Sequence, residues 1–211
     1  MIKGIIFDLD GVLVFTDQFH FAAWKQLASE LGYTIDEEMN SRLRGVSRMD
    51  SLNIVLEKYE GILSNEQKVV LADRKNKIYL NYLENMVPSD VSNAVRKTLA
   101  DLHERGYKIA LGSSSRNAKI ILKKVALEEA FDAISDGTNI SKSKPDPEVF
   151  LKAAEYLDLQ PEECIVVEDA YAGIDAAKAG NMQAVGTGEA YSYAKADYHI
   201  KKIEELLTIL P

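Results

Sequence analysis

A short apolar run near the start of the chain, Ile2 to Phe7, ends directly in two acids and a glycine, Asp8-Leu9-Asp10-Gly11. Apolar runs of this length that stop at turn residues are typical of buried parallel strands. Open α/β sheets built from such strands bind their ligands at the carboxyl ends of the strands. Because side chains alternate along a strand, we expect Asp8 and Asp10 on one face, where they would serve one site. The alternative is a solvated Asp-Gly turn, which can follow any strand.

The bulk properties favour a protein that acts on small molecules. A chain of 211 residues can form one large domain, or one domain that carries an insertion. Its net charge of -8 disfavours nucleic acid as the main partner. No apolar stretch approaches the roughly 20 residues that span a bilayer, and the N-terminus lacks a signal peptide pattern. The single cysteine, Cys164, lies in an apolar run and is expected to be an inert core thiol. We therefore expect a cytoplasmic protein without a membrane partner, and a monomer by default.

Helical patterns dominate residues 17 to 86. Apolar residues recur there at helical spacing up to Gly32, which ends the first helix. Ser47 and Ser64 resemble N-caps, and the residue three positions after each of them, an Asp and a Gln, is typical of capped helix starts. No convincing strand interrupts this block, which we interpret as a helical insertion.

From Pro88 onward, helices alternate with short apolar strands, a pattern typical of βαβ units and a parallel sheet. We predict strands at 107–111, 164–167 and 182–186, and helices that start at Asn117, near Pro147 and near Ala170, with a last helix at 202–210. The expected fold class is α/β: a Rossmann-like, doubly wound parallel-sheet core formed by residues 1–15 and 88–211. A helical cap of residues 16–87 would interrupt it.

Three further polar clusters lie in this part of the chain. Ser113-Ser114-Ser115-Arg116-Asn117 precedes a helix and could bind an anion through hydroxyls and backbone N–H groups, although a Ser-rich N-cap would look the same. The loop 142–147 could hold one lysine toward the sheet edge, or could be an exposed charged loop. Glu168-Asp169 ends an apolar strand and needs a cation nearby, for which Mg²⁺ is suited because it prefers oxygen ligands.

Together these clusters predict phosphoryl transfer. Asp8 is ionised at its ordinary pKa of about 3.9 and could attack phosphorus to form an aspartyl-phosphate. A cation and a lysine would neutralise the developing charge. Asp10 could exchange protons with the leaving and attacking oxygens, provided that a closed site raises its pKa.

In this order, and with a helical insertion after the first strand, the clusters resemble the haloacid dehalogenase superfamily, specifically its phosphotransferases with an α-helical cap. Within it, the chain is most similar to the β-phosphoglucomutase family. The resemblance covers essentially the whole chain and rests on Phe7 to Val12, His20, Trp24-Lys25, Arg44-Gly45-Val46-Ser47-Arg48, Ser113 to Asn117, Lys144-Pro145 and Glu168-Asp169. The first and last motifs occur throughout the superfamily, whereas His20 and the cap motif, residues 44–48, distinguish this family within it.

The resemblance implies a mutase that interconverts β-glucose 1-phosphate and glucose 6-phosphate through a bound β-glucose 1,6-bisphosphate. It implies Asp8 as the phosphorylated nucleophile and Asp10 as the general acid and base. It also implies a Mg²⁺ site and a set of substrate-binding residues. The metal ligands would be Asp8, Asp10, Glu168 and Asp169; the substrate-binding residues would be His20, Trp24, Arg44, Gly45, Val46, Ser47, Arg48, Lys75, Ser113, Ser114, Ser115, Arg116, Asn117 and Lys144.

Plainer interpretations of the cap residues stay open. His20 could be a solvated residue of the first helical turn, Lys75 could lie on a solvated helix face, and Trp24 could belong to the cap core. Arg44 stands where the mutase pattern has lysine, so the preference among hexose phosphates is open. The alternatives for function are a sugar-phosphate phosphatase on the same scaffold and, more remotely, a phospho-accepting signalling receiver.

Overall fold

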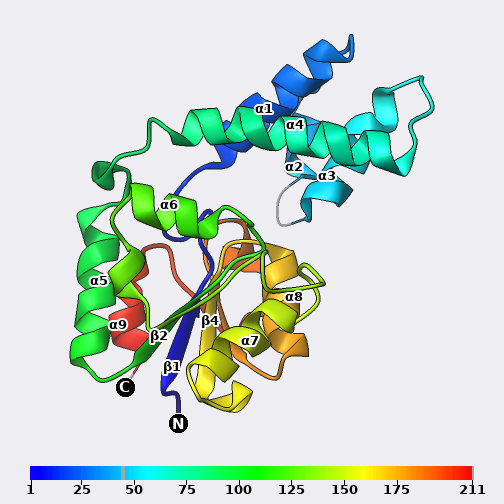
Figure 1. Cartoon of the computed structure of the whole chain (residues 1–211). Helices are drawn as coiled ribbons and strands as arrows, with labels where there is room; N and C mark the ends of the chain where they lie inside the picture. Colours follow the sequence, from blue (N-terminus) through cyan, green and yellow to red (C-terminus); the bar gives the residue numbers. More distant parts are fainter. Residues whose placement is uncertain (44–45, 211) are drawn as a thin grey trace. The chain divides into compact units, whose positions relative to one another are not determined.

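The computed structural model describes residues 1–43 and 46–210. The chain divides into two compact units, the first formed by Met1–Phe15 with Val87–Pro211 and the second by Thr16–Met86. Figure 1 shows that the first unit is an α/β layer structure and the second consists of helices. The β-sheet lies in the first unit and determines where its polar loops meet.

All the strand pairs of this six-stranded sheet are parallel, and their order is β3-β2-β1-β4-β5-β6. The direction of this order reverses between β1 and β4, as in doubly wound folds, whose switch point lies outside the carboxyl ends of the central strands. The strands are β1 Gly4–Phe7, β2 Lys108–Gly112, β3 Ala133–Ser135, β4 Cys164–Glu168, β5 Gln183–Gly186 and β6 Tyr198–His199.

Helices cover both faces of the sheet (Figure 1). They are α5 Asn93–Glu104, α6 Ala118–Lys124, α7 Glu148–Tyr156, α8 Tyr171–Ala179 and α9 Leu206–Ile209. On one face, Ile6 of β1 and Val166 of β4 join a buried cluster with Phe150 of α7 and Ile174 of α8. Strands that are buried on both faces need continuous apolar sequence, and β1 and β4 have it.

The second unit has its own apolar core. Its helices are α1 Asp17–Glu30, α2 Glu37–Ser41, α3 Arg48–Val55 and α4 Asn65–Leu83. Trp24, Leu27 and Leu52 lie in a buried cluster between them. Ser47 caps α3 by accepting a hydrogen bond from the Asp50 N–H, and Ser64 forms a capping box with Gln67 at the start of α4. Both caps were predicted from the sequence.

Some elements differ from the sequence-based expectations. Strands β3 and β6 were not predicted. The segment predicted as one last helix begins with a 3₁₀ turn at Ile203–Glu205 and continues as the four-residue α9. Strand β1 ends at Phe7, so strand alternation does not extend to Asp10. Instead the chain folds back, and the Gly11 N–H donates to the Val14 carbonyl at 2.7 Å.

Candidate active site

The centre of the candidate site is a buried lysine between two acids. Asp8 directly follows β1, and its N–H donates to the Val167 carbonyl at 3.0 Å, so the register brings Asp8 beside Glu168. The Lys144 Nζ lies 2.5 Å from Asp8 Oδ1 and 2.6 Å from Glu168 Oε1. All three side chains are buried. Two carboxylates and one ammonium leave a net negative charge, which favours a second cation at this edge of the sheet.

Burial shifts the pKa values of Asp8 and Lys144 in opposite directions, because it disfavours the charged form of each side chain. Burial is the main cause that raises the pKa of Asp8, the charge of Lys144 opposes it, and the charges of Glu168 and Asp10 add to it, so that the pKa is about 7. For Lys144, burial lowers the pKa, but the two neighbouring carboxylates outweigh it and the net shift is upward. Lys144 therefore stays charged, while the ionisation of Asp8 depends on the charges around it.

The loop after β1 packs closely against Asp169. Gly11 has a φ of +83°, a conformation that favours glycine, and a side chain there would overlap the Asp169 carboxylate. The Asp169 carbonyl accepts a hydrogen bond from Ala190 N–H at 2.8 Å, which holds this residue at the carboxyl end of β4. Asp169 is thus placed beside the Asp8 to Gly11 segment.

These residues fit a magnesium ion. The Asp8 and Asp169 carboxylates and the Asp10 carbonyl are hard oxygen donors, and Mg²⁺ usually needs only one or two carboxylates beside substrate phosphate and water. Within 1–43 and 46–210, no three His, Cys, Asp or Glu side chains lie together in a metal-binding arrangement. Glu168 already accepts from Lys144 through Oε1 and from the Ala170 N–H through Oε2, so it is better suited to an outer role.

The serine-rich loop after β2 has one feature expected of an anion site. The hydroxyls of Ser113 and Ser115 accept hydrogen bonds from the N–H groups two residues further on, Ser115 and Asn117. The Ser114 hydroxyl oxygen is buried and has no hydrogen-bond partner among the described residues. A buried hydroxyl without a partner is costly, and a phosphoryl oxygen would satisfy it. These serines therefore do not cap α6; its N-cap is Asn117, whose side chain accepts no capping hydrogen bond. Arg116 is exposed on this loop.

The loop that carries Lys144 is anchored by residues that the sequence did not reveal. Glu148 Oε2 accepts from the N–H groups of Ser141 and Lys142 at 2.9 and 2.8 Å. The hydrogen bond from the Ser141 hydroxyl, followed by those from these N–H groups, lowers the pKa of Glu148 to about 2. The Phe150 ring centroid lies 4.6 Å from the Lys144 Nζ. An acid at a helix start is a visible signal, but its contact with a loop six residues away, like the ring contact, depends on tertiary structure.

In the helical unit, the structure brings His20, Trp24 and Lys75 together. Lys75 is 3% exposed, so the interpretation of a solvated helix face is wrong. Trp24 is 2% exposed within the core of that unit, and Lys75 Nζ lies 4.7 Å from its ring centroid. His20 is half-buried and contacts Lys75.

The predicted anion-binding segment of the helical unit is described only in part. Arg48 donates to the Asn76 Oδ1 at 2.9 Å and lies 3.9 Å from the Asp73 carboxylate, so two residues of α4 orient its guanidinium group. Val46 and Ser47 are half-buried before it. The predicted residues Arg44 and Gly45 lie outside the described residues.

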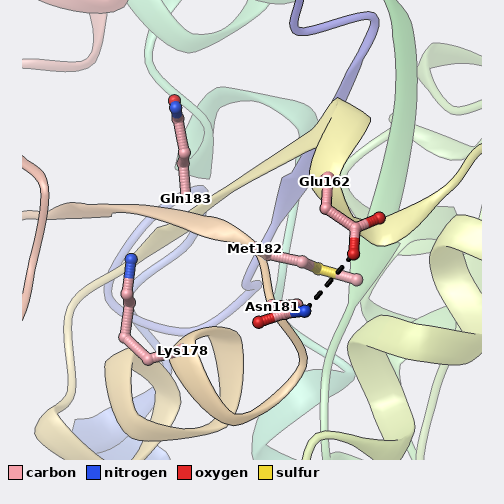
Figure 2. A pocket seen from close by; sticks show the side chains of 5 residues that line it. All are labelled: Glu162, Lys178, Asn181, Met182 and Gln183. Carbon is pink, nitrogen blue, oxygen red and sulfur yellow. Dashed lines mark hydrogen bonds between the residues drawn. The ribbon is translucent and has the colours of Figure 1, made fainter.

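A surface hollow of about 260 Å³ lies at the other end of the sheet. Figure 2 shows its lining side chains, Glu162, Lys178, Asn181, Met182 and Gln183. Glu162 comes just before β4 and Gln183 begins β5, so this hollow lies at the amino ends of the strands, whereas Asp8 and Glu168 lie at the carboxyl ends. The chemistry of the chain is therefore concentrated away from this hollow.

Comparison with known proteins identifies the family of the chain. The family model described as haloacid dehalogenase-like hydrolase matches residues 5–187. The chain belongs to the haloacid dehalogenase-like family. The sequence resemblance is thereby confirmed, and the coarse assignment as an enzyme of this family follows from it.

Relatives of the chain within this haloacid dehalogenase-like family include mutases and phosphatases. It is 41% identical to β-phosphoglucomutase of Bacillus subtilis, over 97% of this chain and 91% of that one. It is 31% identical to a phosphorylated carbohydrates phosphatase of Thermotoga maritima, over 99% and 98% of the two chains. A crystal structure of β-phosphoglucomutase from Clostridium difficile superposes with a TM-score of 0.91 at 38% identity, covering 98% of this chain and 93% of that one.

Proposed function

We propose that this protein is a β-phosphoglucomutase, which interconverts β-D-glucose 1-phosphate and glucose 6-phosphate through phosphorylated Asp8 and β-glucose 1,6-bisphosphate. The observation that carries the proposal is the 41% identity to the Bacillus subtilis mutase across 97% of the chain. The buried group formed by Asp8, Lys144 and Glu168 supports phosphoryl transfer in particular, because it combines a nucleophile with a fixed positive charge.

In the proposed mechanism, an ionised Asp8 oxygen attacks phosphorus while the bond from phosphorus to the sugar oxygen breaks. Lys144 faces the attacking carboxylate and stabilises negative charge on the transferring group. Asp10 gives a proton to the leaving sugar oxygen and takes one from the next attacking hydroxyl. Asp8, Asp169 and the Asp10 carbonyl would hold Mg²⁺, which neutralises phosphate charge and favours the ionised form of Asp8.

The substrate of a mutase carries two phosphates in its bisphosphate form, so two cationic groups are needed. We propose Ser113, Ser114 and Lys144 for the transferring phosphoryl group. For the second phosphate we propose Arg48 together with Ser115, Arg116 and Asn117. A guanidinium group is suited to this role because it binds phosphate oxygens in a bidentate manner.

The second candidate is a sugar-phosphate phosphatase, in which water attacks phosphorylated Asp8. The 31% identity to the Thermotoga maritima phosphatase favours keeping it. A product-resolved assay with β-glucose 1-phosphate, Mg²⁺ and a bisphosphate primer separates the two functions. A mutase yields glucose 6-phosphate with little inorganic phosphate, whereas steady phosphate release without glucose 6-phosphate would reject the mutase.

A further inference from the structure

The helical unit contains a polar cluster where α1 meets α4, two helices that pack along each other (Figure 1). The cluster consists of Thr16 and His20 from the start of α1, and Lys75 and Tyr79 from α4. Lys75 is 3% exposed, and Thr16 and Tyr79 are fully buried. A lysine buried in an apolar core needs a compensating role, and no part of the proposed mechanism explains Tyr79.

The contact between Lys75 and His20 determines where the imidazole carries its proton. The Lys75 Nζ lies 2.7 Å from the His20 Nδ1. A lysine ammonium has only donors, so Nδ1 must accept and cannot itself carry hydrogen. The proton of a neutral imidazole is then on Nε2. Burial first, and the charges of Lys75 and Arg48 next, lower the pKa of His20 well below 6.5, in agreement with a neutral ring.

Aromatic groups hold both partners in this arrangement. The Tyr79 ring stacks on the His20 ring with centroids 3.9 Å apart and an interplanar angle of 29°. The Tyr79 hydroxyl is 2.9 Å from the Thr16 Oγ1, which fixes the tyrosine in turn. The Lys75 ammonium lies 4.7 and 4.8 Å from the ring centroids of Trp24 and Tyr79, so two aromatic faces stabilise its charge.

We propose that Lys75 and Tyr79 are positioning residues that hold His20 as a neutral imidazole with its proton on Nε2. His20 then serves the reaction as a hydrogen-bond donor to an oxygen acceptor and takes no part in proton transfer. The role in the reaction rests on the proposed function, whereas the position of the proton does not.

The direct test is ¹⁵N NMR of the imidazole nitrogens in the full-length protein. For His20 we expect an unprotonated Nδ1 and a protonated Nε2 that persist from about pH 8 down to about pH 5, across the range where an ordinary histidine titrates. A His20 ring that is protonated at neutral pH, or that carries hydrogen on Nδ1, would overturn the proposal.

Substitution of Lys75 tests whether its ammonium group determines the tautomer of His20. Lys75→Met keeps an unbranched side chain but removes the ammonium group, so we expect mixed tautomers and a His20 titration that moves up toward pH 6.5. In the mutase assay, kcat/KM should fall about tenfold, the magnitude expected for one weakened hydrogen bond to a charged group. The pH profile of kcat/KM for Lys75→Met should show an additional ionisation, that of His20, which the wild-type profile lacks. Unchanged ¹⁵N shifts in Lys75→Met would contradict the proposal.

Two further variants separate positioning from general damage. Lys77→Met makes the same change at an exposed position of α4 and should leave both the ¹⁵N pattern and kcat/KM unchanged. Tyr79→Phe keeps the stacked ring and removes the hydroxyl that contacts Thr16, so the tautomer should persist with a smaller loss of kcat/KM. If the Nε2–H ring is found but no isomerase activity, the proposed function fails while the positioning by Lys75 and Tyr79 stands.

Discussion

At the scale of single residues, the candidate site combines charges that conflict unless a cation is present. Asp8 and Glu168 share one ammonium group, and Asp10 adds negative charge close enough to raise the pKa of Asp8. A carboxylate can attack phosphorus only in its ionised form, and a nearby positive charge favours that form. Lys144 is therefore central to both the stability and the chemistry of this group.

Replacing Lys144 with methionine should damage stability as well as activity. The variant leaves two buried acids side by side without their shared cation, and removing one partner of a buried ion pair costs about 3–5 kcal/mol. We expect the free energy of unfolding at pH 7 to fall by about this amount, measured by urea denaturation. The loss should shrink at acidic pH, where Asp8, whose pKa is raised to about 7, becomes protonated and the repulsion between the two acids is relieved. A variant as stable as wild type at pH 7 would contradict the burial of a charged triad.

Asp10→Asn should separate chemistry from folding. The change keeps the size of the side chain but removes its ability to transfer protons, together with its negative charge, so kcat should fall by about 10² to 10⁴-fold. The urea midpoint should remain close to that of wild type. An Asp10→Asn variant that keeps its turnover would end the assignment of Asp10 as acid and base.

At the scale of elements, the loop 141–147 depends on the start of α7. Glu148 accepts hydrogen bonds from two loop N–H groups and from the Ser141 hydroxyl, and these favour its ionised form. Its pKa is about 2 in the folded protein against an ordinary value of 4.5. Because the pKa is lowered, the stabilisation of the loop by ionised Glu148 is fully present above pH 4.5. This stabilisation disappears as pH falls from about 4.5 toward 2.

We therefore expect the loop to loosen as pH falls through that window. Hydrogen exchange of the Ser141 and Lys142 amides, followed at several pH values and corrected for intrinsic rates, measures the effect. Glu148→Gln should show weak protection of these amides already at pH 7 and little further change with pH. Equal protection in Glu148→Gln and wild type would show that other contacts hold the loop.

The sequence predicted those elements whose pattern is local. Strands β1 and β4 are continuous apolar runs, and Ser64 and Gln67 form their capping box within four residues. Strand β3 has three residues and the exposed β6 has two, too few for any periodicity. The burial of Lys75 was equally invisible, because it depends on the ring of Trp24, which another helix supplies, together with that of Tyr79 one turn further along α4.

At the scale of the whole molecule, two separately packed units supply the predicted groups. The α/β unit contains Asp8 as the proposed nucleophile, Lys144 and the serine-rich loop, and the helical unit contains Arg48. Asp8, Lys144 and Glu168, which the structure brings together, could be predicted to share one edge of the sheet, because parallel strands bring their carboxyl ends together. No helix in the described parts of the chain is long and apolar enough to cross a bilayer. A cytoplasmic location and a monomeric state remain predictions.

Substitution of Arg48 in the helical unit distinguishes a mutase from a phosphatase. A mutase must bind a second phosphate, whereas hydrolysis of a small aryl phosphate needs only the transferring group. Arg48→Ala should therefore reduce kcat/KM for β-glucose 1-phosphate about 100-fold, as expected for a lost charge-assisted hydrogen bond of about 3 kcal/mol. Hydrolysis of p-nitrophenyl phosphate by the same variant should change little. Arg42→Ala, which removes an exposed arginine of the same unit that pairs with Glu57, should leave both activities unchanged. Equal losses of the two activities in Arg48→Ala would show that Arg48 does not bind a second phosphate.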